Sequence, residues 1–149
     1  MSLKNTTYVG RQISYRFNNG SPNQLSQRVG MNGTSNSLLY NGPTGIRTFG
    51  NDNPQVTIEN VTIYGMTNDG LRAQAAGTLF IKNTISVGSG DEDFDLDDAG
   101  VVIDPSSGYN LYSTVMGGVH PGSSNQAPPA SLDDLFLPIG VGSEDLHLE

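Results

Sequence analysis

The stretch of residues 91–98 carries the densest set of chemically active side chains in the chain, because it reads Asp-Glu-Asp-Phe-Asp-Leu-Asp-Asp. In a strand, successive side chains point to opposite faces, so Phe94 and Leu96 should face the core and Asp93, Asp95 and Asp97 should form a row on the outer face. Like charges this close repel one another unless a cation neutralises them, and carboxylate oxygens suit calcium. The candidate calcium ligands are Asp91, Asp93, Asp95 and Asp97.

Two other interpretations of this acidic stretch stay open. The calcium loop of an EF-hand requires glycine where Leu96 stands, so that motif is absent, and a solvated acidic edge that aids solubility is the simpler explanation. Paired carboxylates also hydrolyse glycosidic bonds, one as acid and the other as nucleophile or base. The candidate catalytic residues are Asp93, Asp95 and Asp97, with Arg72 as a partner for an acidic sugar.

Arginine and aromatic side chains could bind a sugar. Arg47 and Arg72 each follow an apolar residue that should face inward, so both should face outward, where they either bind an acidic sugar or are ordinary solvated charges. Outward aromatic rings would form a stacking platform for sugar rings, or would pack against neighbouring loops. The outward aromatic candidates are Tyr64, Phe80, Tyr109 and Tyr112, and the predicted ligand-binding set is Arg47, Tyr64, Arg72 and Phe80.

The elements that must position these residues are short strands with a repeated corner. Apolar residues alternate with polar ones over residues 56–65 and again over 79–88, and each alternation is interrupted by an asparagine. Each segment therefore predicts two short strands joined at a corner. Asparagine tolerates left-handed backbone angles, and its amide can bond to the amide of the next repeat. The predicted corner residues are Asn60, Asn83 and Asn110.

The repeats follow one another at a period typical of stacked folds. Gly45-Ile46-Arg47 leads the first copy and Gly70-Leu71-Arg72 leads the second, so the period is about 22 to 25 residues. This period predicts an all-β right-handed parallel β-helix, or solenoid, of about three to four coils with a loop-rich C-terminal tail. An antiparallel sandwich, whose short strands also recur regularly, is the alternative.

The same segments carry a family resemblance. Residues 56–65, 70–72 and 79–88 resemble the right-handed parallel β-helix repeat proteins of the pectate-lyase-like superfamily, and 108–113, 134–136 and 145–148 look like the end of uncharacterised members from phage, bacteria and environmental sequences. In those relatives a further Ala-Ile-Asp-Ala-Gly segment usually follows, so the resemblance implies a piece of a longer solenoid. The superfamily includes lyases, hydrolases, adhesins and phage tail components, and the polygalacturonase motifs Asn-Thr-Asp, Gly-His-Gly and Arg-Ile-Lys are absent.

Composition narrows the function classes. With 149 residues, a net charge of −8 and only seven Lys and Arg, the chain has no basic stripe for nucleic acid, and no apolar run approaches the ~20 residues that span a bilayer. The absence of cysteine excludes disulfides and cysteine-based zinc sites. We expect no cofactor apart from calcium, and no nucleic-acid or membrane partner.

The expected organisation is one domain over 1–149. Residues 1–44 form irregular first coils, 45–113 the regular coils and 114–149 a loop-rich capping tail. Exposed coil ends predict a homo-oligomer or other end-to-end association. The expected function is a non-catalytic structural or carbohydrate-binding module of a phage or cell-surface protein, with an extracellular, cell-surface or virion location. The alternative function is a polysaccharide lyase or glycoside hydrolase.

Overall fold

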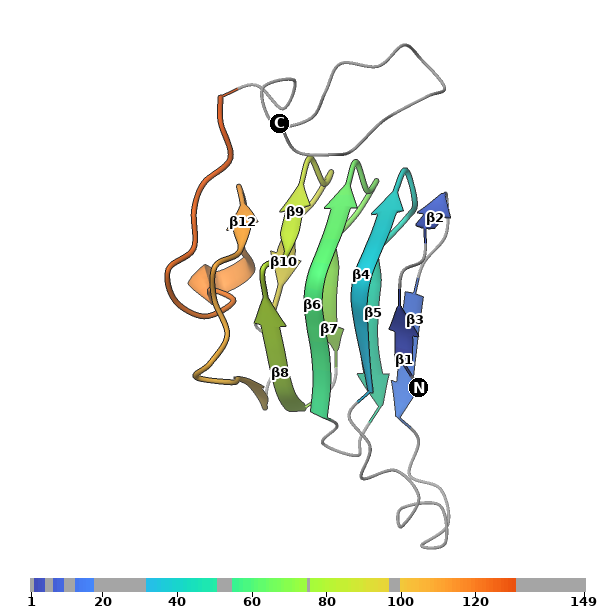
Figure 1. The fold of residues 1–149 in the computed structure, drawn as a ribbon, viewed down its shortest axis with the longest axis vertical. Helices are drawn as coiled ribbons and strands as arrows, with labels where there is room; N and C mark the ends of the chain where they lie inside the picture. Colours follow the sequence, from blue (N-terminus) through green and yellow to red (C-terminus); the bar gives the residue numbers. More distant parts are fainter. Residues whose placement is uncertain are drawn as a thin grey trace, which may run out of the picture.

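The computed structural model describes residues 2–4, 7–9, 13–17, 32–50, 55–74, 76–96 and 100–130 (Figure 1). Strands dominate these residues, and none of their helices is long and apolar enough to cross a membrane. The elements are β1 (Ser2–Lys4), β2 (Thr7–Val9), β3 (Ile13–Phe17), β4 (Asn32–Tyr40), β5 (Ile46–Gly50), β6 (Gln55–Tyr64), β7 (Leu71–Gln74), β8 (Gly77–Lys82), β9 (Ile85–Val87), β10 (Phe94–Asp95), β11 (Val101–Ile103), β12 (Leu111–Tyr112) and the 3₁₀ turn η1 (Met116–Gly118).

The strands form two parallel sheets. The larger, eight-stranded sheet has the order β1-β4-β6-β8-β11, with β2 beside β4, β9 beside β6, and β12 beside β9. The smaller, four-stranded sheet has the order β10-β7-β5-β3. Every strand pair in the described part of the chain is parallel, which excludes the antiparallel sandwich.

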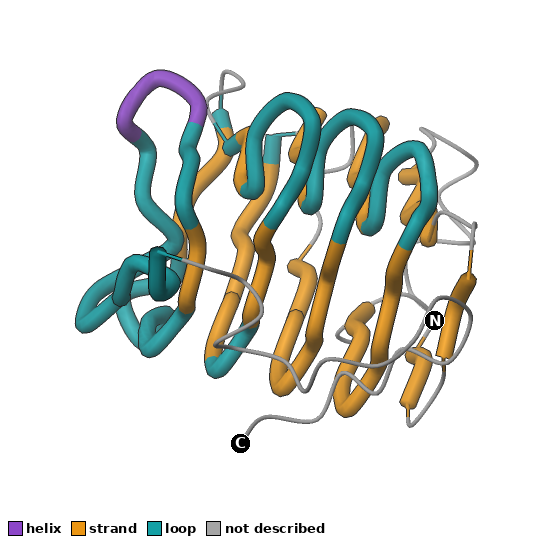
Figure 2. The backbone as a smooth tube through the Cα atoms, turned by 90° about the horizontal axis from the view of Figure 1, so that it is seen from above, coloured by secondary structure: helices purple, strands orange, loops and turns teal. Residues whose placement is uncertain are grey.

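The sequence repeat sets the strand register. Ile58 of β6 lies opposite Ile81 of β8, and Arg47 of β5 lies opposite Arg72 of β7, so equivalent positions of successive copies are neighbours. Each copy forms one layer of the stack, and the connections after β4, β6 and β9 lie side by side (Figure 2). Backbone hydrogen bonds such as Thr67 N to Gly42 O (2.9 Å) and Gly90 N to Met66 O (2.9 Å) join these connections.

Alternate residues of β6, β7 and β8 point into a shared apolar core. Burial alternates along β6 and β8, as the period of two predicts. The smaller sheet adds buried residues to the same core, and Phe94 and Leu96 are buried as predicted. The largest fully buried side chains include those of Leu39, Ile46, Ile58, Ile63, Leu71, Ile81 and Phe94.

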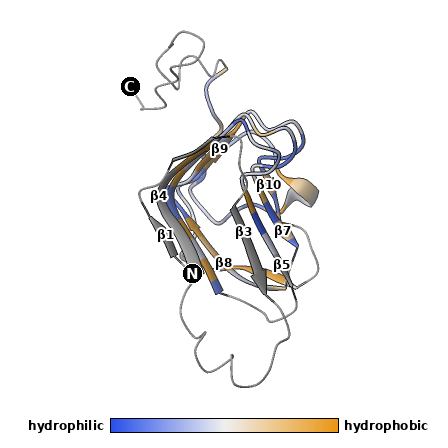
Figure 3. Cartoon of the chain, turned by 90° about the vertical axis from the view of Figure 1, so that its right-hand side faces the viewer, coloured by the Kyte–Doolittle hydropathy of each residue, from blue (hydrophilic) through white to orange (hydrophobic). Residues whose placement is uncertain are grey.

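The predicted closed right-handed parallel β-helix is wrong. The larger sheet is curled like half a barrel and the smaller sheet is separate from it, so the described residues form no closed solenoid (Figure 3). The corner residue explains the difference. Asn60 has a φ of 53°, yet β6 continues through it from Gln55 to Tyr64, so the backbone bends within one sheet where the prediction placed a change of face.

Candidate functional site

Arg72 of β7 forms ion pairs with two carboxylates beside β10, which is the edge strand of the smaller sheet. The register places Arg72 opposite Asp95, and its Nε lies 3.1 Å from Asp95 Oδ2. This is a charge contact, because within the described residues the Nε makes no aligned hydrogen bond. Arg72 Nη1 lies 3.3 Å from Asp69 Oδ2, with 39% of the Arg72 side chain exposed and only 2% of the Asp69 side chain. The guanidinium is therefore engaged with protein carboxylates rather than free in solvent.

Asp93 is buried, and the prediction that it faces outward is wrong. Only 1% of the surface of Asp93 is exposed. Its Oδ1 accepts a hydrogen bond from the Ser89 N–H at 3.2 Å, and its Oδ2 accepts those of Ser113 at 2.8 Å and Thr114 at 3.3 Å. The Asp93 N–H in turn donates to Thr114 Oγ1 at 2.9 Å. This carboxylate ties its own connection to the next layer of the stack, which is a structural role.

Asp95 is also buried, at 6% exposure, although the alternation predicts that it faces outward. The side chain of Arg72 lies against it from the neighbouring strand β7, so a polar partner rather than solvent meets the carboxylate. Asp97 lies outside the described residues. The row of outward aspartates predicted from the sequence is therefore absent at Asp93 and Asp95.

A different group of carboxylates converges near this edge. One ligand oxygen from each of Asp69, Asp91 and Glu92 lies within 4.8 Å of the others, and such groups are common in proteins without a bound ion. Of the predicted calcium ligands that the structure describes, Asp91, Asp93 and Asp95, only Asp91 belongs to the group. The other two members could be found from the repeat. When Leu71 is aligned with Phe94, Asp69 of one layer lies opposite Glu92 of the next layer.

The predicted sugar-binding residues are spread over two sheets. Arg47, in the smaller sheet, donates from Nε to Gln74 Oε1 at 2.6 Å. Tyr64 and Phe80 are half-buried residues of the larger sheet, where they lie opposite Val87 and Thr57. Arg47 lies opposite Arg72 on the neighbouring strand, but Tyr64 and Phe80 belong to the other sheet, so the four side chains do not form one site.

Asn60 and Asn83 lie at equivalent bends, but Asn110 does not. Asn83 has a φ of 48° and its Nδ2 donates to Asn60 Oδ1 at 3.2 Å. In the next layer a bridge between Lys82 and Gly108 aligns Tyr109, with a φ of 57°, with Asn83. The predicted corner position at Asn110 is therefore wrong by one residue. The Pro-Ser-Ser-Gly turn before it places Tyr109 at the bend.

Asn110 instead points inward and joins neighbouring layers. It is 1% exposed, its Oδ1 accepts the Thr84 N–H at 2.9 Å, and its Nδ2 donates to Ile81 O at 3.0 Å and to Pro121 O at 2.7 Å. The Asn110 N–H donates to Asn125 Oδ1 at 3.0 Å. A buried side chain with every polar atom bonded holds the backbone around Tyr109 in place.

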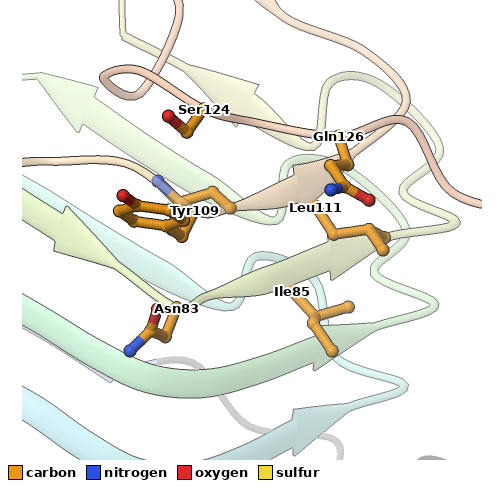
Figure 4. A pocket seen from close by; sticks show the side chains of 7 residues that line it. Asn83, Ile85, Tyr109, Leu111, Ser124 and Gln126 are labelled. Carbon is orange, nitrogen blue, oxygen red and sulfur yellow. The ribbon is translucent and has the colours of Figure 1, made fainter.

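A shallow groove of about 290 Å³ opens over these bends (Figure 4). Three successive layers contribute two columns of side chains, since Leu111 lies opposite Ile85 on one side and Gln126 on the other. One column consists of Asn83, Tyr109 and Ser124, and the second of Ile85, Leu111 and Gln126, with Asn110 completing the lining.

The lining of this groove combines an aromatic ring, aliphatic surface and neutral polar groups. Tyr109 is 65% exposed, and none of the described residues that line the groove is charged. Binding sites commonly pair apolar surface with a few polar groups that fix orientation. Among the lining residues, sequence reasoning singled out Asn83, Asn110 and Tyr109 but missed the others, because the weak strand at Leu111 and the loop at 124–126 show no clear alternation.

The described residues thus define an all-β protein of stacked parallel strands with a neutral outer groove. Comparison with protein-family models, with curated proteins and with solved structures finds no match for this chain.

Proposed function

We propose that this chain is a non-catalytic structural module that binds carbohydrate, as part of a phage or cell-surface protein. The observation that carries the proposal is the structural use of the carboxylates in the one stretch that suggested catalysis: Asp93 accepts three backbone N–H groups and Asp95 is paired with Arg72. The phage or cell-surface setting rests on the resemblance of residues 56–65 and 79–88 to pectate-lyase-like repeat proteins.

The contacts of these residues favour binding over turnover. A glycosidase needs two carboxyl groups that face the scissile bond from either side, and Asp93 has its oxygens occupied by backbone donors in the protein interior. A lyase needs a group that takes a proton from the sugar, whereas the Arg72 guanidinium is engaged in ion pairs with Asp69 and Asp95. Neither role is available to these side chains in their present contacts.

The second candidate is a polysaccharide lyase or glycoside hydrolase. The convergence of Asp69, Asp91 and Glu92 near Arg72 favours it, because carboxylates that bind calcium together with a basic residue are what a lyase uses.

A turnover screen separates the two candidates. The chain is incubated with neutral and acidic polysaccharides, with calcium or with a chelator, and released reducing ends and unsaturated sugars are measured. We expect no release, together with binding on a glycan array. Release that requires calcium and is lost in Asp91→Asn, while circular dichroism stays unchanged, would establish the lyase and overturn the proposal.

A further inference from the structure

We infer that the groove over Tyr109 and Leu111 binds a neutral oligosaccharide that lies across successive layers of the stack. The inference rests on the proposed function and adds to it the place of binding and the class of glycan.

Tyr109 interrupts a ladder of asparagine amides at this point. Asn60 and Asn83 are hydrogen bonded through their side chains, but the equivalent residue of the next layer is a tyrosine. Among the described residues neither Asn83 Oδ1 nor the Tyr109 hydroxyl takes part in a hydrogen bond, and both side chains line the groove. An aromatic residue with a φ of 57° is uncommon, and residues held in such conformations cluster at binding sites.

The groove offers both kinds of surface that a sugar presents. The exposed ring of Tyr109 and the aliphatic side chains of Ile85 and Leu111 match the apolar C–H face of a pyranose (Figure 4). The amides of Asn83 and Gln126 and the hydroxyl of Ser124 both donate and accept hydrogen bonds, as sugar hydroxyl groups require. The two columns cross three layers, so successive sugars would meet successive layers.

Charge selects the class of glycan. The described lining has no cationic side chain to pair with a uronate carboxylate, and the chain carries a net charge of −8. An acidic oligosaccharide would therefore be repelled without local compensation. The rigid support of the groove by Asn110 reduces the conformational entropy that binding must overcome.

The test uses the full chain and titrates it with four probes in parallel. These are a neutral glucose hexasaccharide and a neutral mannose hexasaccharide, a galacturonate hexasaccharide, and an uncharged extended hexapeptide. Binding is followed by tyrosine fluorescence and by calorimetry, with Tyr109→Ala as the test variant. Tyr109→Phe keeps the ring, and Val102→Ala removes an exposed apolar side chain outside the groove as a control.

We expect a neutral hexasaccharide to bind. Tyr109→Ala should weaken its binding at least tenfold, while Tyr109→Phe and Val102→Ala should each change it less than about threefold. Binding of a neutral glycan that is unaffected by Tyr109→Ala would overturn the groove but leave the proposed function standing. Binding of only the galacturonate would overturn the choice of a neutral ligand. Binding of only the peptide, or of no probe, would overturn both this inference and carbohydrate binding.

Discussion

Asp93 holds two layers together through its carboxylate. Replacing it with alanine leaves the N–H groups of Ser89, Ser113 and Thr114, whose hydrogen bonds to Asp93 are partly buried, without their acceptor. We expect Asp93→Ala to lower the free energy of unfolding by about 1 to 3 kcal/mol, measured by urea denaturation. Asp91→Ala removes an exposed carboxylate from the same connection and should change it by less than about 0.5 kcal/mol. Equal losses in the two variants would contradict the structural role of Asp93.

Gly70 permits the close approach of neighbouring layers. A Cβ added there would overlap Ser86 Oγ and would lie 2.6 Å from the carbonyl oxygen of Asp93. We expect Gly70→Ala to lower the free energy of unfolding by about 1 to 3 kcal/mol or more, because an overpacked core forces backbone shifts.

A double-mutant cycle tests the origin of that cost. Ser86→Ala removes one of the two clashing atoms, so Gly70→Ala should cost less in that background by about 0.5 kcal/mol or more, measured by the same urea denaturation. Strictly additive losses would show that Ser86 is not the obstacle.

The recurrence of glycine at positions 45 and 70 has a steric cause, since an added Cβ at Gly45 would lie 2.5 Å from the carbonyl oxygen of Gly70.

At the scale of elements, local alternation predicted the strands and their pairing but not the shape of the sheet. The segments around Ile58 and Ile81 pair in register as equal positions of a repeat should. Alternation reports which side chains are buried, but it does not report whether a bend moves the chain to another sheet. Asn60 bends β6 without ending its pairing with β4, and on the other edge the partner of β6 changes from β8 before the bend to β9 after it, so the larger sheet curls and no closed coil results.

The acidic stretch shows why the site was harder to predict. Alternation placed Phe94 and Leu96 in the core, which is confirmed, but Asp93 and Asp95 are buried as well. The groups that cover them come from distant positions, the loop at Ser113 and Thr114 and the side chain of Arg72. The period of a single strand contains no information about these partners. The pairing of Arg72 with Asp95 becomes visible only when the two copies of the repeat are aligned and their equivalent side chains are compared.

Tyr112 of β12 joins the last layers of the stack and predicts an alkaline pH dependence. Its ring packs edge-on against Phe94 at 5.3 Å between centroids, and its hydroxyl lies 2.6 Å from His120 Nδ1. Burial raises the pKa of Tyr112 above its ordinary value of 10.0, and the Asn125 side chain offsets part of this rise. The folded state therefore holds this proton more tightly than the unfolded state, so its contribution to stability is complete below about pH 10 and is lost as the pH rises through the folded pKa.

Urea denaturation between about pH 8 and about pH 11 measures this effect. The free energy of unfolding should fall more steeply with pH for the wild-type chain than for Tyr112→Phe, which has no proton to lose. Taking the difference between the two chains removes the titration of the other tyrosines and lysines. Parallel curves would show that the burial of Tyr112 does not act on its ionisation.

The whole molecule is a stack in which most strands depend on the layers on either side. β6 has partners on both edges, β4 on one and β8 and β9 on the other, whereas β11 has only β8 as a partner among the described strands. We expect amide hydrogen exchange, followed by mass spectrometry, to be slowest in β6 and fastest in β11. Uniform protection across the two strands would indicate that another part of the chain or a second copy covers the edge of β11. Sedimentation at several concentrations separates these cases, and association through exposed ends stays a prediction.

The alignment of equivalent residues in successive layers gives the outer surface a fixed spacing. Each layer places one residue in the column of bends at a step of about 4.8 Å. Duplicating a full repeat would lengthen that column by one such step and keep every neighbour in phase, whereas inserting a single residue inside a strand would invert the inward and outward faces downstream of it. Insertions or deletions of whole repeats would therefore be tolerated far better than insertions of single residues. Each inserted repeat would lengthen the column of bends on the outer surface by one step.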